Sequence, residues 1–228
     1  MNICGLEKLT VTDYPGYVSC IVFTQGCNFN CPFCHNSSLI PFAKGSITED
    51  EVFAYLEKRK KVLDGVVITG GEPLLQLNIK DFIKKIKNLG LKVKLDTNGT
   101  NYKMLKELID EGLVDYIAMD IKNDMSNYES ISGYKKFNFD SIKDTIKLIE
   151  SSKVDYEFRT TLVKEYHNYQ NVENICEFLN QKSKYYLQNF ENNEAVLTGG
   201  LHGFAESELK NMAEKLKEKH SNIIVRGL

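Results

Sequence analysis

The feature that most constrains the fold is a regular alternation of short apolar runs with longer amphipathic runs. The short runs are rich in Val, Ile, Tyr and Phe, which favour strands. The longer runs repeat apolar residues with helical spacing. The predicted strands are 18–24, 65–69, 92–96, 116–121, 155–163, 185–190 and 222–226, and the predicted helices are about 48–63, 78–89, 102–111, 140–151, 170–181 and 205–219.

Repeated strand–helix units predict parallel strands joined by right-handed crossovers, and therefore an α/β fold. Six or seven units in 228 residues are too few for a closed eight-fold barrel, which needs about 250. We expect an open, partial β/α barrel of about six parallel strand–helix units. No linker or break in composition divides the chain, so we expect a single domain over 1–228, with an N-terminal extension at 1–16 and the barrel at about 17–228.

Local signals support one helix start and two helix ends. Thr48 and Glu51 form the pattern of a capping box, in which each side chain satisfies the other residue's backbone amide. Gly90 and Gly112 follow two of the predicted helices and are suited to the left-handed conformation that ends a helix.

Composition excludes several classes of protein. The chain is 42% hydrophobic and 26% charged, which is typical of a globular protein rather than a disordered one. A net charge of −2 disfavours nucleic-acid binding through bulk positive charge. No uninterrupted apolar run exceeds four residues, so we expect no transmembrane helix and no membrane partner. No secretory signal is visible, and we expect a cytoplasmic protein whose clustered thiols bind metal rather than form disulfides.

The cysteines are unevenly distributed, because Cys27, Cys31 and Cys34 lie within eight residues directly after the first core strand. Structural zinc normally takes four ligands, so a zinc site would have to recruit His35, Cys20 or a distant group. Three thiolates without a fourth suit a [4Fe–4S] cluster that leaves one iron open for another ligand. We expect the remaining cysteines, Cys4, Cys20 and Cys176, to be bystanders.

Polar motifs follow the next three strands, at what would be one edge of a parallel sheet. They are Gly70-Gly71-Glu72-Pro73, Asp96-Thr97-Asn98-Gly99 and Asp120-Ile121-Lys122. Each could be only a turn or a surface ion pair. Carboxylates at this edge could also accept from ribose hydroxyls or an ammonium group, and Lys122 could pair with a ligand carboxylate. Arg159, on the fifth strand, could close an internal salt bridge or contact a ligand. Asp13 is a turn residue by composition.

These motifs resemble those of a known family. The C-x3-C-x2-C pattern, with Phe33 before the last cysteine, looks like the signature of radical S-adenosylmethionine (SAM) enzymes. GGEP, DTNG and D-I-K are similar to the SAM-binding segments of glycyl-radical-enzyme activases, which include pyruvate formate-lyase activase. The order of DYPG, TQGCNFNCPFCHN, DGVVITGGEPLLQ, KVKLDTNG, DYIAMDIK, YEFRTTLV, LQNF and VRG resembles the anaerobic ribonucleoside-triphosphate reductase activating protein subfamily.

The resemblance implies two cofactors, one [4Fe–4S] cluster on Cys27, Cys31 and Cys34 and one SAM. It implies that GGEP holds the methionyl amino group. It also places Asp13 near the substrate glycine, and suggests that Asp13 joins Asp96 at a monovalent cation. His202 matches no family segment and is interpreted as a loop residue. The residues expected to bind cofactor are Phe33, His35, Gly70, Gly71, Glu72, Asp96, Asn98, Asp120, Lys122, Arg159 and Gln188.

The implied activity is reductive cleavage of SAM to methionine and a 5′-deoxyadenosyl radical, which removes a hydrogen from a backbone glycine of a glycyl radical enzyme. The expected partners are anaerobic ribonucleoside-triphosphate reductase and a low-potential electron donor such as flavodoxin or ferredoxin. One alternative is a radical SAM enzyme that acts on another glycyl radical enzyme or on a small molecule. Another is a non-catalytic iron–sulfur or zinc protein. Only Cys176 follows Cys34, so ligands for a second cluster are lacking.

Overall fold

The computed structural model describes residues 1–134 and 138–226, so Gly227 of the terminal VRG block lies outside the described residues. These residues belong to two compact units. The first comprises 1–28, 38–118 and 152–155, and the second comprises 29–37, 119–151 and 156 onward.

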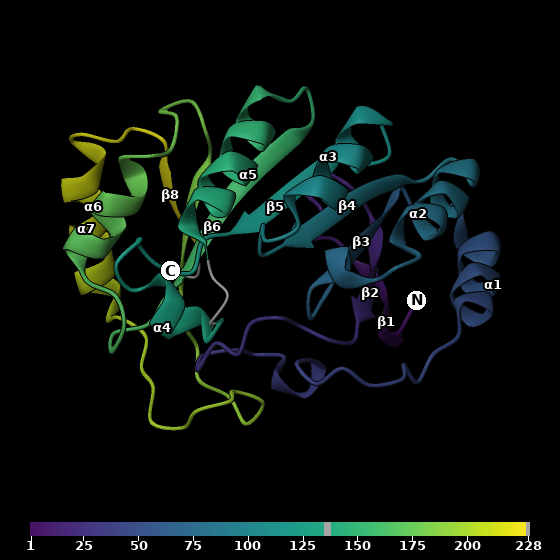
Figure 1. Cartoon of the computed structure of the whole chain (residues 1–228), viewed down its shortest axis with the longest axis horizontal. Helices are drawn as coiled ribbons and strands as arrows, with labels where there is room; N and C mark the ends of the chain where they lie inside the picture. The colour runs from purple at the N-terminus through teal and green to yellow at the C-terminus, as the bar shows by residue number, and fades with distance from the viewer. Residues whose placement is uncertain (135–137, 227–228) are drawn as a thin grey trace. The chain divides into compact units, whose positions relative to one another are not determined.

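Strands and helices alternate along the chain, as Figure 1 shows. The strands are β1 (Ile3–Thr10), β2 (Ser19–Thr24), β3 (Gly65–Gly70), β4 (Lys92–Thr97), β5 (Tyr116–Asp120), β6 (Asp155–Leu162), β7 (Tyr185–Asn189) and β8 (Ile223–Arg226). The α-helices are α1 (Glu49–Arg59), α2 (Ile79–Asn88), α3 (Tyr102–Asp110), α4 (Tyr128–Ser132), α5 (Phe139–Ser151), α6 (Tyr169–Cys176) and α7 (Glu206–Lys217). Two short 3₁₀ helices are η1 (Ser37–Leu39) and η2 (Pro73–Leu75).

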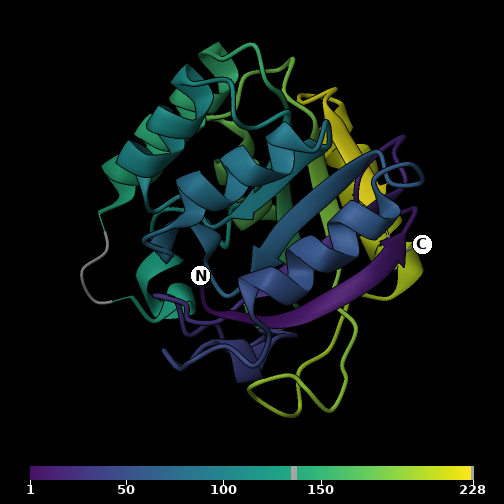
Figure 2. The ribbon, with the colours of Figure 1, turned by 90° about the vertical axis from the view of Figure 1, so that its right-hand side faces the viewer.

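In the first unit β2, β3 and β4 pair in parallel, with Ser19 opposite Gly65 and Gly65 opposite Lys92. This register aligns the carboxyl ends of the three strands. The purple strand β1 in Figure 2 runs antiparallel to β2 and forms the edge of this sheet. The strands and the amphipathic helix α2 bury apolar side chains, which accounts for most of the stability of such a layer. The fully buried side chains include Val22, Ile68, Val93, Leu95, Phe82 and Ile83.

In the second unit β6, β7 and β8 pair in parallel, with Tyr185 opposite both Phe158 and Ile223. Side chains alternate between the two faces of a strand, so Phe158, Thr160 and Leu162 share the buried face of β6. Glu157, Arg159 and Thr161 occupy the other face. That face carries polar groups that matter for the site.

The predicted fold class is confirmed, because the chain is α/β and its sheet pairing is mostly parallel. All seven predicted strands are present, with ends shifted by at most one residue. The predicted extension 1–16 contains a strand that the sequence did not reveal, because the run ICGLEKLT lacks strand alternation and pairing with β2 stabilises it. The helix predicted over 170–181 ends at Cys176, where tight turns replace α-helical bonds.

The predicted helix ends are also confirmed. Thr48 and Glu51 form the capping box at the start of α1. Gly90 and Gly112 have φ angles of +79° and +64°, the left-handed region that ends a helix. Across residues 1–134 and 138–226, no helix is long and apolar enough to cross a membrane.

Candidate functional site

The carboxyl edge of the first unit is built around a close backbone contact at Gly71. The amide of Gly71 donates to the carbonyl of Thr24 at 2.9 Å, and the amide of Glu72 donates to the carbonyl of Gly26 at 2.9 Å. A Cβ on Gly71 would lie 2.2 Å from the Gly26 oxygen, so a side chain cannot fit there. Glycine at this position therefore lets the GGEP loop pack directly on the residue before Cys27.

Glu72 joins two loops through a fully buried carboxylate. Its Oε1 accepts hydrogen bonds from the Leu74 amide at 3.0 Å and the Thr97 hydroxyl at 2.8 Å. Its Oε2 accepts from the Asn98 amide at 2.6 Å. These donors occupy both oxygens, so Glu72 positions the GGEP and DTNG loops relative to each other.

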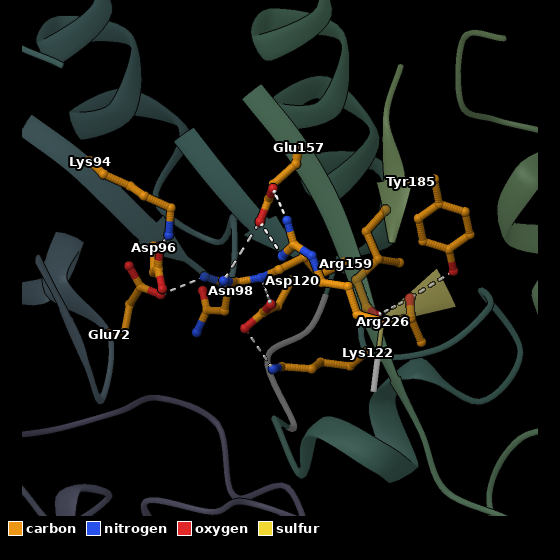
Figure 3. Close-up of polar contacts among 12 residues, drawn as sticks. Glu72, Lys94, Asp96, Asn98, Asp120, Lys122, Glu157, Arg159, Tyr185 and Arg226 are labelled. Carbon is orange, nitrogen blue, oxygen red and sulfur yellow. Dashed lines mark hydrogen bonds and ion pairs between the residues drawn. The ribbon is translucent and has the colours of Figure 1, made fainter. Parts of the chain in front are cut away.

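Asn98 extends this connection toward the cysteine segment. Its Nδ2 donates to Asn28 Oδ1 at 2.8 Å, and Asn28 Nδ2 donates to Thr100 Oγ1 at 2.9 Å. Nearby on β4, Lys94 is 2% exposed and its ammonium lies 2.5 Å from Asp96 Oδ1 (Figure 3). A lysine this buried needs a charge partner, which Asp96 supplies.

The cysteine segment is divided between the units, since Cys27 belongs to the first and both Cys31 and Cys34 belong to the second. Cys20 is buried within β2, as expected. Burial raises the pKa of the Cys31 thiol to about 11, against an opposing effect of Lys122. A metal ion that bound the Cys31 sulfur would therefore have to displace this proton. Among the described residues, no three His, Cys, Asp or Glu side chains are grouped as ligands of a single metal ion.

In the second unit Asp120 lies between two cations (Figure 3). Its Oδ1 is 2.8 Å from Arg159 Nε, and its Oδ2 is 3.1 Å from Lys122 Nζ. Burial alone would raise the pKa of Asp120, but Arg159 and Lys122 outweigh it and lower the pKa to about 2. Burial lowers the pKa of Lys122, yet the Asp120 charge outweighs it and raises that pKa overall. Both groups are therefore charged at neutral pH.

A second ion pair follows on the same face of the second unit's sheet. Glu157, whose side chain is almost fully buried, accepts two hydrogen bonds from Arg226, at 3.0 and 2.8 Å. The Arg226 guanidinium also covers the ring of Tyr186 at 3.6 Å. Gln188 lies opposite Thr161 and Arg226 in the neighbouring strands, so it belongs to the same polar row.

The aromatic residues of the cysteine segment are packed. Phe33 is buried against Tyr166 and His167, with ring centroids 6.1 and 5.9 Å away. His35 stacks on Phe190 at 5.2 Å, and its Nε2 lies 2.7 Å from the Glu191 carbonyl. His202 is in an exposed loop, as expected, with its Nδ1 2.8 Å from Glu165.

Asp13 is in a different part of the first unit from the other carboxylates. Its carboxylate accepts from the hydroxyls of Thr10 and Thr12, in the turn between β1 and β2. Thr10 pairs with Ser19 at the amino end of β2, whereas Asp96 lies at the carboxyl end of β4. The hypothesis that Asp13 and Asp96 share a cation is therefore wrong for this structure, because the two carboxylates lie at opposite ends of parallel strands.

Sequence patterns did not identify four further polar residues, namely Lys94, Glu157, His167 and Arg226. Lys94 and Glu157 each lie two residues from a predicted site residue on the same strand, so strand periodicity could have placed them on its face. His167 is in a loop, and nothing local identifies its partners.

The arrangement has the character of an α/β enzyme with polar groups at strand ends and a cysteine-rich segment after the first parallel strand. The family model described as the Radical SAM superfamily matches residues 21–179, and the chain therefore belongs to the radical SAM superfamily. The match includes the three cysteines, GGEP, DTNG and Arg159.

Relatives agree with this membership. The chain is 30% identical to a Methanocaldococcus jannaschii protein described as a glycyl-radical enzyme activating enzyme, over 99% of this chain and 96% of that protein. It is 31% identical to the pyruvate formate-lyase-activating enzyme of Clostridium pasteurianum, over 95% of this chain and 90% of that protein. These relatives confirm the expected likeness to the activase group.

A solved structure shows the same fold. Streptococcus suis SuiB, bound to its precursor peptide SuiA, has a TM-score of 0.74 and 15% identity to this chain. The match covers 91% of this chain and 48% of SuiB.

Proposed function

We propose that this chain is a glycyl-radical-enzyme activase that cleaves SAM reductively at a [4Fe–4S] cluster. The observation that carries the proposal is the C-x3-C-x2-C segment of Cys27, Cys31 and Cys34, which follows the first parallel strand of a chain that belongs to the radical SAM superfamily. Cys27, Cys31 and Cys34 would supply three thiolates, which fits a four-iron cluster with one iron open. When bound, the cluster and SAM supply the electron transfer and the 5′-deoxyadenosyl radical.

The GGEP and DTNG segments would bind the amino and ribose groups of SAM. Gly70 and Gly71 bring backbone polar groups to the loop edge, and they could hold the methionyl ammonium. Asp96 would accept hydrogen bonds from ribose hydroxyls, and Asn98 would accept from or donate to them. Glu72 would act indirectly by holding these two loops, since its carboxylate is already occupied by protein donors.

Lys122 and the residues around it would bind the carboxylate and adenine groups of SAM. Lys122 is a charged ammonium that could pair with the SAM carboxylate. Asp120 and Arg159 would keep that ammonium oriented and balance its charge. Phe33, His35 and Gln188 would contact the adenosyl moiety. No general base is needed, because the cofactor carries the bond-breaking chemistry and the protein supplies orientation and shielding.

We further propose that 1–228 acts as one radical SAM domain on a protein partner, and that this partner is anaerobic ribonucleoside-triphosphate reductase. The family match spans residues of both units, which supports the single domain. Activating-enzyme relatives of nearly the same length support a protein substrate. A low-potential flavodoxin or ferredoxin would supply the electron.

The chemistry is tested with anaerobically reconstituted protein. We expect SAM to change the electron paramagnetic resonance spectrum of the reduced cluster, and dithionite with SAM to release methionine and 5′-deoxyadenosine. An unchanged spectrum with no methionine would overturn the proposal and favour a non-catalytic iron–sulfur or zinc protein.

A further inference from the structure

His167 is a buried histidine that the proposed chemistry does not use. It is 3% exposed, in the loop between β6 and α6 of the second unit. Its two ring nitrogens contact the backbone of two different loops: Nδ1 lies 3.1 Å from the Val163 amide, and Nε2 lies 2.9 Å from the Lys122 carbonyl. A buried side chain that joins two loops in this way restricts both.

The neighbouring groups determine the tautomer of this imidazole. The amide of Val163 can only donate, so Nδ1 accepts and the ring proton resides on Nε2. Nδ1 also lies 3.3 Å from the Val163 carbonyl, but that oxygen already accepts from the amides of Tyr166 and His167 at 3.0 and 2.8 Å. Nε2–H therefore donates to the Lys122 carbonyl. Burial lowers the pKa of His167, which keeps the ring neutral as this pattern requires.

The Lys122 end of this contact belongs to a segment with little freedom. The Ile121 amide donates to the Arg159 carbonyl at 2.8 Å, and Asn123 Nδ2 donates to the Tyr166 carbonyl at 3.0 Å. Asp124 is almost fully buried and accepts from Asn171 at 3.0 Å. The His167 contact restrains the peptide plane that follows Lys122, and so influences where its side chain leaves the backbone.

The same imidazole also contacts the cysteine segment. The ring of Phe33 meets that of His167 edge-on, at 5.9 Å and an angle of 69°. Phe33 lies between Cys31 and Cys34, and its neighbour Pro32 accepts from the Thr198 amide at 2.9 Å. His167 thus touches both the residue before Cys34 and the residue whose ammonium pairs with Asp120.

We propose that His167 is a positioning residue for SAM binding, which fixes the Lys122 backbone through its Nε2–H and supports Phe33 with its ring. The inference rests on the proposed function, because it assumes that Lys122 binds SAM. Replacing residues that orient metal ligands typically costs 10- to 100-fold in metal affinity, and we expect a loss of the same kind for a residue that orients Lys122. The Lys122 contact rather than the Val163 contact would have this role, because only the Lys122 contact reaches the residue that carries the ammonium.

Two matched variants separate these contacts. In His167→Gln the terminal amide nitrogen can occupy the place of Nε2 and still donate to Lys122, whereas in His167→Asn the shorter side chain can reach only the Val163 amide. SAM affinity is measured by equilibrium dialysis on reconstituted protein, together with the SAM-induced change in the cluster spectrum and the melting temperature. Lys122→Met is measured in parallel as the test of the SAM site itself.

We expect His167→Asn to weaken SAM binding about tenfold and to reduce the spectral change, while His167→Gln stays within about threefold of wild type. Equal SAM affinity in both variants and wild type, with weakening only in Lys122→Met, would overturn the role of His167 and leave the proposed function intact. Equal weakening of both variants would also overturn it, as an effect of general destabilisation. If Lys122→Met bound SAM as tightly as the wild-type protein, the result would instead count against the proposed contact between Lys122 and SAM.

A measurement without SAM or substitution tests the same geometry. Nitrogen chemical shifts of ¹⁵N-histidine-labelled wild-type protein should show His167 protonated at Nε2 and unprotonated at Nδ1. The opposite tautomer would overturn the contact with Lys122.

Discussion

The charge cluster of the second unit gives a quantitative prediction for Asp120→Asn. The substitution keeps the shape of Asp120 but removes the negative charge between Lys122 and Arg159. A carboxyl group whose pKa falls from 3.8 to about 2 on folding stabilises the folded state by about 2.5 kcal/mol at neutral pH. Because the Asp120 side chain is 31% exposed, solvent screening reduces this to about 1–2 kcal/mol.

The sign of the pH dependence follows from the lowered pKa. The stabilisation is complete above the unfolded-state pKa of about 4, and it is lost as pH falls through the folded-state pKa of about 2. About half of it should remain at pH 3. We therefore expect urea denaturation to show Asp120→Asn less stable than wild type by about 1–2 kcal/mol at pH 7, with a smaller difference at pH 3.

Asp110→Asn is a suitable control, because Asp110 pairs with Lys106 on an exposed helix face. Its free energy of unfolding should change by less than about 0.5 kcal/mol. The reasoning would be refuted if Asp120→Asn matched the wild-type stability at pH 7, or if its deficit stayed constant down to pH 3.

Three further predictions concern the loops and the cysteines. The amount of iron and sulfide bound after reconstitution should fall in each of three variants, Cys27→Ser, Cys31→Ser and Cys34→Ser. Cys4→Ser is the control and should keep the wild-type iron and sulfide content. Iron loss in Cys4→Ser alone would contradict the ligand assignment. Glu72→Gln should destabilise the protein by about 2 kcal/mol in urea denaturation, because a side-chain amide cannot accept hydrogen bonds from all three donors that Glu72 serves. Unchanged stability would contradict the assignment of Glu72 as the residue that joins the two loops. Gly71→Ala should weaken SAM binding in equilibrium dialysis, because the added Cβ would meet the Gly26 carbonyl. Gly199→Ala is the control and should leave SAM affinity unchanged, because Gly199 faces open space. Equal SAM affinities in the two variants would refute the close-contact argument.

Local sequence was sufficient for most of the fold. Strand and helix positions follow from periodicity, and the ends of α1 and α2 follow from a capping box and a glycine. β1 was missed because its stability comes from pairing with β2 rather than from its own pattern. The short helix α4 gives too few residues for periodicity to detect.

The site was only partly predictable, because motif position reveals which residues lie at strand ends but not which groups they contact. Glu72 was expected to bind cofactor, yet its three protein donors come from positions 74, 97 and 98. The proposed Asp13–Asp96 pair came from the family resemblance, and it failed because the DYPG turn lies at the amino end of β2 whereas Asp96 lies at the carboxyl end of β4. The role proposed for His167 depends on its contacts with Phe33, Lys122 and Val163, which form only in the folded chain.

The most direct test of the central claim is glycyl radical formation on a partner protein. Reconstituted protein, SAM and dithionite are incubated anaerobically with anaerobic ribonucleoside-triphosphate reductase, and the glycyl radical is recorded by electron paramagnetic resonance. The account predicts a glycyl radical signal with wild-type protein and none with Cys31→Ser. Release of methionine without any glycyl radical would contradict the proposed partner and favour another glycyl radical enzyme or a small-molecule substrate.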